Sequence, residues 1–257
     1  MKELRVLVTT LDEEVNLPDC LASVDFAGEV WVVDSFSKDR TPDIAREAGA
    51  RLVQREYRSP ADQKNWAMDA MGPGWVLILD ADERVGPELR EEIIRVLAAP
   101  EREAYWVPRR TWFLGREIRH CGWQRDGVVR LLRQEAGRYD PALVHEEMRC
   151  RGPVGRLEGH IEHHSYRSLD DYLERMRRYA RQGGLQRFRQ GKRAGAAKVL
   201  LRPAARFLRM YVLQGGWRDG AHGFLLCALS SLQVGLKHAI HWAYAHGILE
   251  DAGESRD

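Results

Sequence analysis

The sequence VLILDADERV at residues 76–85 runs an apolar segment directly into three acids. The run from Val76 to Leu79 is typical of a central parallel strand that is buried on both faces. Asp80, Asp82 and Glu83 follow it. Carboxylates at this position lie at the carboxyl edge of a sheet, where open α/β folds bind their ligands. Because Asp80 and Asp82 are one residue apart, both can face a single metal ion there.

Strands and helices alternate in the sequence that precedes this segment. The expected strands are 4–10, 29–34 and 50–53, and the expected helices are 16–24, 41–48 and 62–70. Such alternation predicts an α/β fold with a doubly wound, mainly parallel sheet.

The pattern changes after residue 97. Further strands are expected at 105–113, 128–133 and 159–164, and apolar residues recur at helical spacing beyond Ser168. We therefore expect an α/β domain over residues 1–167 and a basic helical extension over residues 168–257.

The composition is that of a globular protein, with 257 residues, 44% of them hydrophobic and 30% charged. Four scattered cysteines argue against a zinc ribbon or a disulfide framework and suit a reducing compartment. No secretory leader is visible. The apolar stretch at 224–236 is too short and too polar to cross a bilayer of ~30 Å. These features predict a cytoplasmic protein that is soluble or peripheral at the inner face of the cell membrane.

Polar residues follow three of the expected strands. They are Thr9, Thr10, Asp12, Glu13 and Glu14 after the first, Asp34 after the second, and Asp80, Ala81 and Asp82 after the last. A divalent cation such as Mg²⁺ binds through one or two carboxylates and leaves other positions to phosphate and water. A neighbouring aspartate can accept hydrogen bonds from a ribose or a base. Asp34 and Asp39 alone would favour helix and turn caps, whereas all three clusters in register favour a nucleoside diphosphate site. The usual glycine-rich dinucleotide motif and the P-loop are both missing.

Six segments carry a resemblance to a known family. They are TTLDEEVNLPDCLASV at 9–24, EVWVVDSFSKDRTPDIAREAGARLV at 29–53, LILDADERV at 77–85, DGVVRLLR at 126–133, VHEE at 144–147 and GGWRDGAHGFLLCAL at 215–229. Together they resemble the family 2 glycosyltransferases, which have the GT-A fold and a D-x-D metal motif. Within that family they are similar to the lipopolysaccharide core β-glycosyltransferases. Asp12 and Phe36 depart from the family, which usually has Asn and a small residue at these positions.

The resemblance implies an inverting glycosyltransferase that uses a divalent metal (Mg²⁺ or Mn²⁺). Its donor would be a nucleoside diphosphate-sugar, with a UDP-sugar favoured, and its acceptor a lipid-linked or lipopolysaccharide-core saccharide. The implied metal ligands are Asp80 and Asp82, and the implied donor-binding residues are Thr10, Glu13, Asp34, Gln63, Lys64, Asn65, Asp80 and Ala81. Lys64 can offset phosphate charge and Asn65 can bond across the site, although Lys64 is equally explained as an exposed helix lysine.

Glycosyl transfer needs a base that takes the proton of the acceptor hydroxyl. The candidates are Asp126, Glu146 and Glu147. We favour Glu146, with His145 orienting it or touching the diphosphate. Asp126 is the alternative base, but it precedes Arg130 by four residues and is equally explained by a structural ion pair with that arginine.

Two other clusters suggest binding sites. The segment GHIEHHS at 159–165 could bind zinc, but core or acceptor-pocket histidines are the favoured interpretation. A group of aromatic and basic residues suits sugar rings that bear negative groups, or else an ordinary interdomain core. This group consists of Trp106, Trp112, Phe113, Trp123, Arg109, Arg110, Arg116 and Arg119.

Residues 175–209 contain twelve Lys or Arg residues and no acid. A basic amphipathic helix of this kind fits an anionic membrane surface, and also fits RNA or a solvated face. We expect the membrane and no nucleic acid, because no nucleic-acid-recognition fold is visible. The rival functions are a nucleotidyltransferase, which would need a glycine-rich signature after the first strand, and a non-catalytic membrane or RNA adaptor.

Overall fold

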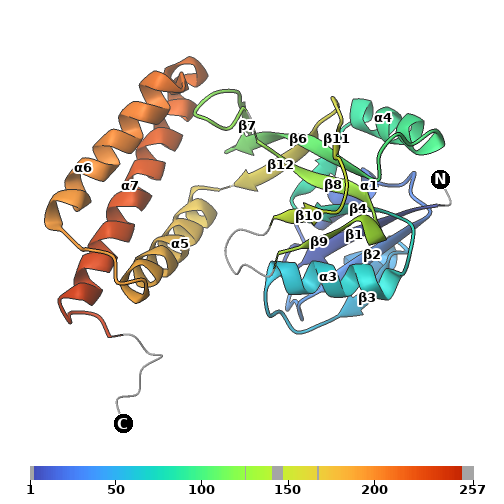
Figure 1. Ribbon diagram of the computed structural model, residues 1–257, viewed down its shortest axis with the longest axis horizontal. Coiled ribbons are helices and arrows are strands. Elements are labelled where there is room, and N and C mark those ends of the chain that lie inside the picture. Colours follow the sequence, from blue (N-terminus) through green and yellow to red (C-terminus); the bar gives the residue numbers. More distant parts are fainter. Residues whose placement is uncertain (1–2, 125, 141–146, 167, 251–257) are drawn as a thin grey trace, which may run out of the picture. The chain divides into compact units, whose positions relative to one another are not determined.

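The computed structural model describes residues 3–124, 126–140, 147–166 and 168–250. The chain forms two units (Figure 1). Residues 1–110 and 125–163 form the first, called here the α/β unit, and residues 111–124 and 164–257 form the second, called the helical unit. The expected boundary at 167–168 lies close to this division, but residues 111–124 join the helical unit.

The sheet of the α/β unit has a parallel part in the order β3-β2-β1-β4. These strands are β1 Leu4–Thr10, β2 Glu29–Asp34, β3 Arg51–Gln54 and β4 Trp75–Asp80. Next to β4, β8 (Gly127–Arg133) runs antiparallel, and β6 (Ala104–Phe113) pairs antiparallel with β8. The remaining elements of this unit are the helices α1 Leu17–Ala22, α2 Thr41–Glu47, α3 Pro60–Met71 and α4 Pro87–Ala98, the 3-10 turn η1 Gln134–Ala136, the strands β5 Glu83–Val85, β9 Gly137–Tyr139, β10 Met148–Cys150 and β11 Gly155–Arg156, and the start of β12 Ile161–Tyr166.

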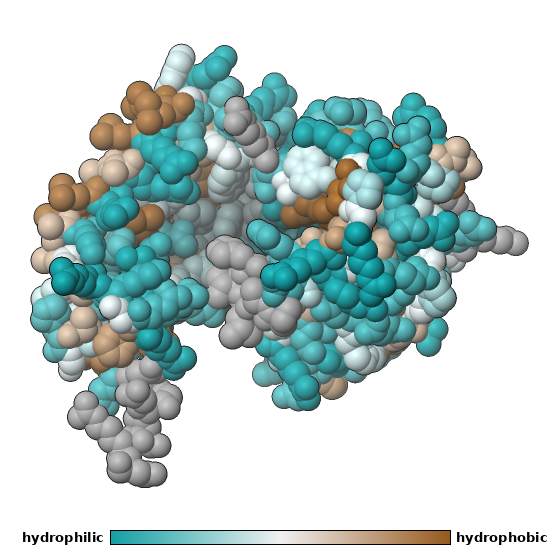
Figure 2. Space-filling view, in the orientation of Figure 1, coloured by the Kyte–Doolittle hydropathy of each residue, from teal (hydrophilic) through white to brown (hydrophobic). Residues whose placement is uncertain are grey.

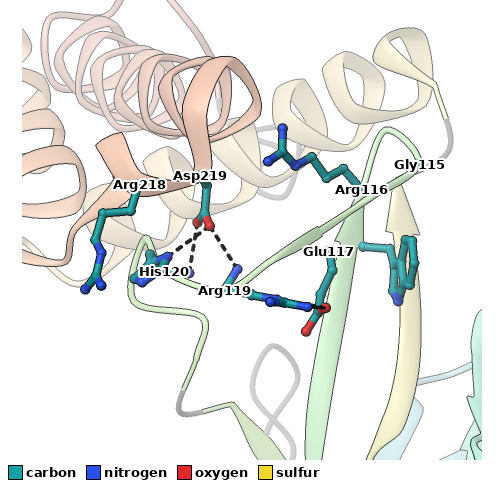
Figure 3. A pocket seen from close by; sticks show the side chains of 8 residues that line it. Gly115, Arg116, Glu117, Arg119, His120, Arg218 and Asp219 are labelled. Atoms are coloured by element: carbon teal, nitrogen blue, oxygen red, sulfur yellow. Dashed lines mark hydrogen bonds and ion pairs between the residues drawn. The ribbon is translucent and has the colours of Figure 1, made fainter.

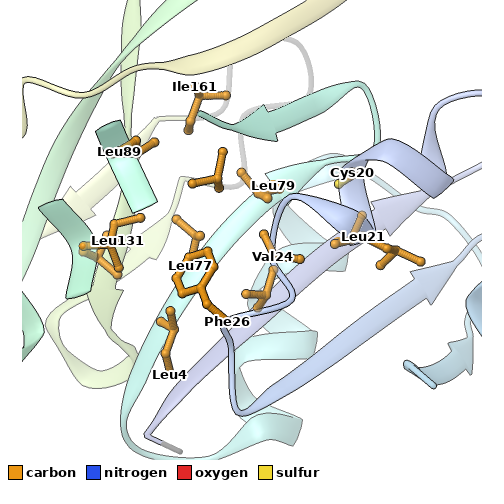
Figure 4. Close-up of a cluster of buried hydrophobic side chains, with 14 of the residues drawn as sticks. Leu4, Cys20, Leu21, Val24, Phe26, Leu77, Leu79, Leu89, Leu131 and Ile161 are labelled. Carbon is orange, nitrogen blue, oxygen red and sulfur yellow. The ribbon is translucent and has the colours of Figure 1, made fainter. Parts of the chain in front are cut away.

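Alternate residues of the parallel strands enter two separate cores. On one face, Val6 and Val8 pack in a cluster with residues of α1, α2 and α4, which Figure 4 shows in part. On the other face, Leu7 packs with Met68 of α3. Each fully buried leucine or valine stabilises the fold by about 1.5–3 kcal/mol relative to exposure. Because both faces are covered, the expected α/β fold with a doubly wound, mainly parallel sheet is confirmed.

The helical unit contains three long helices. They are α5 Leu169–Arg189, α6 Ala196–Leu208 and α7 Gly220–Ala245, and they are accompanied by β7 Arg116–Ile118, the π-helical turn η2 Arg209–Leu213 and the 3-10 turn η3 Gly216–Asp219. Ser168 caps α5, since its hydroxyl accepts a hydrogen bond from the Asp171 amide at 3.1 Å. Gly184 lies within α5 and lets α7 approach closely, because a Cβ atom there would lie 2.7 Å from Ile240. The expected C-terminal helical extension is confirmed.

The length of α7 corrects one expectation. Residues Gly216–Ala245 form the one helix in the described part of the chain that is long and apolar enough to cross a membrane, by length and composition alone. The stretch at 224–236 is only part of these 30 residues, in which η3 runs directly into α7, so the inference that the segment is too short and too polar to cross a bilayer was wrong. The same test is passed by core helices of soluble proteins.

Candidate active site

The register of the parallel strands brings the three polar edges together. β1 lies between β2 and β4, with Thr10 opposite Asp34 and Thr9 opposite Asp80. The polar residues at the carboxyl ends of these strands are therefore neighbours, as the sequence predicts. This edge is the ligand-binding position of open α/β sheets.

Asp80 is the last residue of β4, and two cations bind its carboxylate. The Lys64 Nζ lies 2.9 Å from Asp80 Oδ1, and the Arg130 Nη2 lies 2.5 Å from Asp80 Oδ2. Burial would raise the pKa of Asp80, but Arg130 and Lys64 outweigh it and hold that pKa well below the usual range. Asp80 is therefore ionised at neutral pH, as a metal ligand must be.

Lys64 is buried, with only 2% of its surface exposed. Ser59 caps α3 by accepting a hydrogen bond from the Asp62 amide. Lys64 lies on the same side of this helix as the buried Ala61 and Met68, because residues three and four apart share a face. A buried ammonium needs an anionic partner, and Asp80 supplies it. The interpretation of Lys64 as an exposed helix lysine was wrong.

Behind Asp80, Glu83 lies between two arginines. Its fully buried carboxylate accepts hydrogen bonds from Arg130 at 2.9 Å, from Arg109 at 3.2 Å and from the Asp80 amide at 3.0 Å. Arg109 in turn binds both oxygens of Asp126, at 3.0 and 2.9 Å. Three cations and three anions thus alternate from Lys64 to Asp126. This set, called here the charge network, consists of Lys64, Asp80, Arg130, Glu83, Arg109 and Asp126.

The charge network predicts the effect of Glu83→Gln on stability. The change removes the negative charge of the carboxylate with which both Arg109 and Arg130 pair. Breaking a buried ion pair typically costs about 3–5 kcal/mol. We expect the free energy of unfolding, measured by urea denaturation, to fall by that amount. Glu91→Gln on the exposed side of α4 is the matched control and should change stability by less than about 0.5 kcal/mol. An unchanged urea midpoint for Glu83→Gln would contradict the importance of the network.

Asp82 is the second expected metal ligand, and it is buried. The His163 Nε2 lies 3.5 Å from its Oδ2. Desolvation would lower the pKa of His163, but the Asp82 carboxylate outweighs that effect and raises it. Among the described residues, no group of three or more His, Cys, Asp or Glu could hold a metal ion, so the histidine segment at 159–165 forms no zinc site there. Two carboxylates nevertheless fit Mg²⁺ or Mn²⁺, which takes its other ligands from phosphate and water.

The residues expected near the nucleoside mainly hold loops in place. Asp34 is fully buried and accepts hydrogen bonds from Thr10 Oγ1 at 3.2 Å, from the amide and hydroxyl of Ser37 and from Gln54 Nε2 at 3.0 Å. Glu13 accepts a hydrogen bond from Asn16 Nδ2 at 2.6 Å. These bonds fix the loops after β1 and β2, which border the carboxyl edge.

The segment beside the expected donor site is also held internally. Asn65 Nδ2 donates to the Tyr139 carbonyl at 3.0 Å and Asn65 Oδ1 accepts from the Tyr139 amide at 2.9 Å, so this side chain joins α3 to β9. The buried Gln63 donates to Ser35 Oγ at 3.0 Å. Ala81 is buried between the two aspartates of the D-x-D motif.

The structure describes one of the two preferred base candidates. Asp126 pairs with Arg109, so the alternative interpretation of Asp126, an ion pair with Arg130, was wrong, because Arg130 contacts Asp80 and Glu83 instead. Glu146 and His145 lie outside the described residues.

Sequence reasoning missed the roles of Arg109, Arg130 and Glu83. A signal for Arg130 was present, since it is a charged residue within the apolar run VVRLLR at 128–133. Arginine is almost never buried without a partner, and such a position therefore indicates a nearby acid.

Comparison with known proteins places this geometry in context. The family model described as glycosyl transferase family 2 matches residues 5–148. The lipopolysaccharide core biosynthesis glycosyltransferase LpsC of Rhizobium meliloti is 31% identical over 230 residues, which cover 86% of this chain and 85% of LpsC.

Two solved structures are similar at lower identity. TarS 1–349 of S. aureus is 13% identical to this chain, with a TM-score of 0.46. The match covers 95% of this chain and 92% of the TarS chain. Glucosyl-3-phosphoglycerate synthase of Mycobacterium tuberculosis, in complex with Mn²⁺, UDP and glucosyl-3-phosphoglycerate, is 23% identical. The match covers 44% of this chain and 45% of the synthase chain, with a TM-score of 0.36.

Proposed function

Because the chain belongs to glycosyl transferase family 2 and is a glycosyltransferase, we propose that it moves a sugar from a UDP-sugar to a lipid-linked or lipopolysaccharide-core saccharide, with inversion. The observation that carries the proposal is the D-x-D pair at the end of β4. Asp80 and Asp82 lie at the carboxyl end of the buried strand β4. The strand β1 pairs in parallel with β4 on one side and with β2 on the other, so the carboxyl ends of all three strands lie at one edge. Family membership sets aside the nucleotidyltransferase and the non-catalytic adaptor.

The proposed reaction consists of three changes. The acceptor hydroxyl oxygen bonds to the anomeric carbon, the bond from that carbon to the diphosphate breaks, and the hydroxyl proton passes to a base of the protein. We assign the base to Glu146, with His145 in the role of orienting it or touching the diphosphate. Asp126 is less suited, because both of its oxygens already accept hydrogen bonds from Arg109.

Asp80 and Asp82 are the residues that would hold Mg²⁺ or Mn²⁺. Such an ion neutralises charge on the departing diphosphate. Lys64 and Arg130 support this role, because they keep Asp80 ionised and fixed in position. The nucleoside is proposed to bind against the loops that Thr10, Glu13 and Asp34 hold. Asn65, which is hydrogen-bonded to Tyr139 of β9, is proposed to lie at the border of the same site. Ala81, which stands between Asp80 and Asp82, is proposed to lie there as well.

The proposed donor is tested by nucleotide release. With Mn²⁺ and an acceptor-containing extract, UDP-sugars should be consumed, with release of UDP. Consumption of only GDP- or CMP-sugars would remove the UDP assignment while leaving the glycosyltransferase family unaffected.

We also propose that the helical unit docks on an anionic membrane, on the inner face of the cell membrane, without crossing it. α6 has no buried residue, and large apolar side chains are exposed along α6 and η2. Leu200 is 76% exposed and Leu213 is 81% exposed. Figure 2 shows hydrophobic patches on the helical unit among hydrophilic residues. Arg202, Arg206 and Arg209 lie in the same segment, and each basic residue near an anionic leaflet contributes about 1 kcal/mol.

The packing of α7 supports docking rather than crossing. Its buried residues include His238 and His241, and it contacts α5, whose sequence contains several arginines. Desolvation, together with Arg187 and other nearby cations, lowers the pKa of His238 to about 4. A helix that packs its polar residues against a charged neighbour would have to leave that neighbour in order to span a bilayer.

Liposome sedimentation tests the docking proposal. The full chain should bind vesicles that contain phosphatidylglycerol, and binding should weaken at high salt as the Debye length shrinks. The double variant Leu200→Glu/Leu213→Glu should bind at least about tenfold less, because it places charge on the apolar face. Ile94→Glu on α4 is the control and should bind like the wild type. Equal binding to neutral phosphatidylcholine vesicles, or unchanged binding by the double variant, would contradict the proposal.

A further inference from the structure

The helical unit contains a hollow of about 670 Å³ that the donor site does not use. It is lined by side chains of the segment 112–120, which includes β7, and by Arg218 and Asp219 of η3 (Figure 3). A volume of this size is typical of small-molecule sites. Arg218 and Asp219 belong to the segment GGWRDGAHGFLLCAL at 215–229, to which neither the donor site nor the base assigns a role.

A buried carboxylate fixes the wall of this hollow. Asp219 is buried and accepts hydrogen bonds from the amides of Arg119 and His120, at 3.3 and 2.8 Å, and lies 3.0 Å from the His120 Nδ1. Glu117 accepts two hydrogen bonds from Arg119, at 3.1 and 2.9 Å. Both acids of the hollow are therefore engaged within the wall.

Two arginines of the hollow have no acidic partner. Within residues 3–124, 126–140, 147–166 and 168–250, neither the guanidinium group of Arg116 nor that of Arg218 forms an ion pair or a hydrogen bond, and both residues are exposed. The Trp112 Nε1 is buried and likewise has no hydrogen-bond partner among the described residues. The hollow thus presents two guanidinium groups and is bordered by Trp112. A ligand with anionic oxygens would satisfy the donors of both guanidinium groups.

We infer that this hollow binds an acidic saccharide, a sugar that carries a phosphate or a carboxylate, as part of the acceptor. The inference rests on the proposed function, since a glycosyltransferase must hold its acceptor. Guanidinium groups match the geometry of phosphate and carboxylate oxygens, which lysine does not. An indole ring offers a flat apolar body and a polar N–H, a combination that suits a sugar ring. The pinning of residues 119 and 120 by Asp219 keeps the site preformed.

Calorimetry on the full chain tests this inference. UDP and Mn²⁺ are present at saturating concentrations, so that the donor site is already occupied and cannot bind the phosphate of a probe. The probes are glucose 6-phosphate, glucose and inorganic phosphate. We expect glucose 6-phosphate to bind at least about tenfold more tightly than either other probe, which corresponds to about 1.4 kcal/mol. Arg116→Gln and Arg218→Gln should each weaken that binding at least about fivefold. Arg177→Gln, an exposed arginine of α5 outside the hollow, is the matched control.

The outcomes separate this inference from the proposed function. Equal affinity for glucose, unchanged affinity in both arginine variants, or inorganic phosphate binding as tightly as glucose 6-phosphate would each overturn the acidic-saccharide site. UDP binding should be the same in all variants, which also reports that they fold. If the wild-type protein does not bind UDP, the proposed donor site is contradicted. The binding of glucose 6-phosphate, measured without UDP, would still decide the inference about the hollow.

Discussion

Replacing Asp82 with alanine should abolish sugar transfer while leaving the fold intact. Asp80 and Asp82 are the two carboxylates proposed to hold the metal, and no larger metal-binding group exists among the described residues. Loss of a metal that stabilises the leaving diphosphate by about 4 kcal/mol corresponds to a roughly thousandfold loss in rate. Transfer rate and Mn²⁺-dependent UDP binding, measured on the same preparation, should both fall to background.

The structure offers a control for this change. Asp43 of α2 is an exposed aspartate that pairs with Arg46, away from the D-x-D motif. Asp43→Ala should transfer sugar at the wild-type rate. Circular dichroism should report the same helix content for both variants. A folded Asp82→Ala protein with normal turnover would remove Asp82 from the metal site.

The second large effect is expected for Glu146→Gln. An amide of the same shape cannot accept the proton of the acceptor hydroxyl, and a general base contributes about 10²–10⁴ in rate. The variant should therefore lose that factor in kcat and keep its affinity for the donor. Single-turnover kinetics with a radiolabelled UDP-sugar, at saturating acceptor, measures this separation.

Asp126→Asn is the comparison that identifies the base. Asp126 is bound by Arg109 within the charge network, so this change should lower stability more than it lowers the rate of a folded enzyme. If folded Asp126→Asn loses 10²–10⁴ in kcat and Glu146→Gln does not, Asp126 is the base and the assignment of Glu146 is wrong.

The sheet and its polar edge could be predicted because they depend on local patterns. The run from Val76 to Leu79 is continuously apolar, as expected of a strand covered on both faces, and β4 is such a strand. In a parallel sheet the carboxyl ends of neighbouring strands share one edge, so the polar residues after β1, β2 and β4 had to be close.

The charge network could not be predicted, because its partners are distant in the sequence. One of the two interpretations of Asp126 was an ion pair with Arg130 at a spacing of four, which brings side chains together on a helix. Arg130 lies on β8, where the rise is about 3.3 Å per residue and four residues span about 13 Å. Asp126 is thus out of reach, and Arg130 instead contacts Asp80 at the end of the neighbouring strand β4 and Glu83 in β5, which are 50 and 47 residues away in the sequence.

The membership of residues 111–124 in the helical unit was equally hidden. Phe113 and Cys121 belong to one buried cluster with Met210 and Leu226. This contact joins segments about 100 residues apart, so no local periodicity reports it. The same cluster explains why the hollow beside β7 was not anticipated as a single site, although Trp112, Arg116 and Arg119 had been grouped as acceptor-binding residues.

The central claim is that the carboxyl edge of β1, β2 and β4 binds a UDP-sugar together with a divalent metal. Titration of UDP into the full chain by calorimetry, with and without Mn²⁺, tests it most directly. We predict binding in the presence of Mn²⁺, at least about tenfold weaker binding in EDTA, and no metal-dependent binding by Asp82→Ala. A stabilisation of about 2.7 kcal/mol at a hundredfold excess over Kd should accompany it. Absence of UDP binding in Mn²⁺, or the same affinity with and without the metal, would contradict the claim.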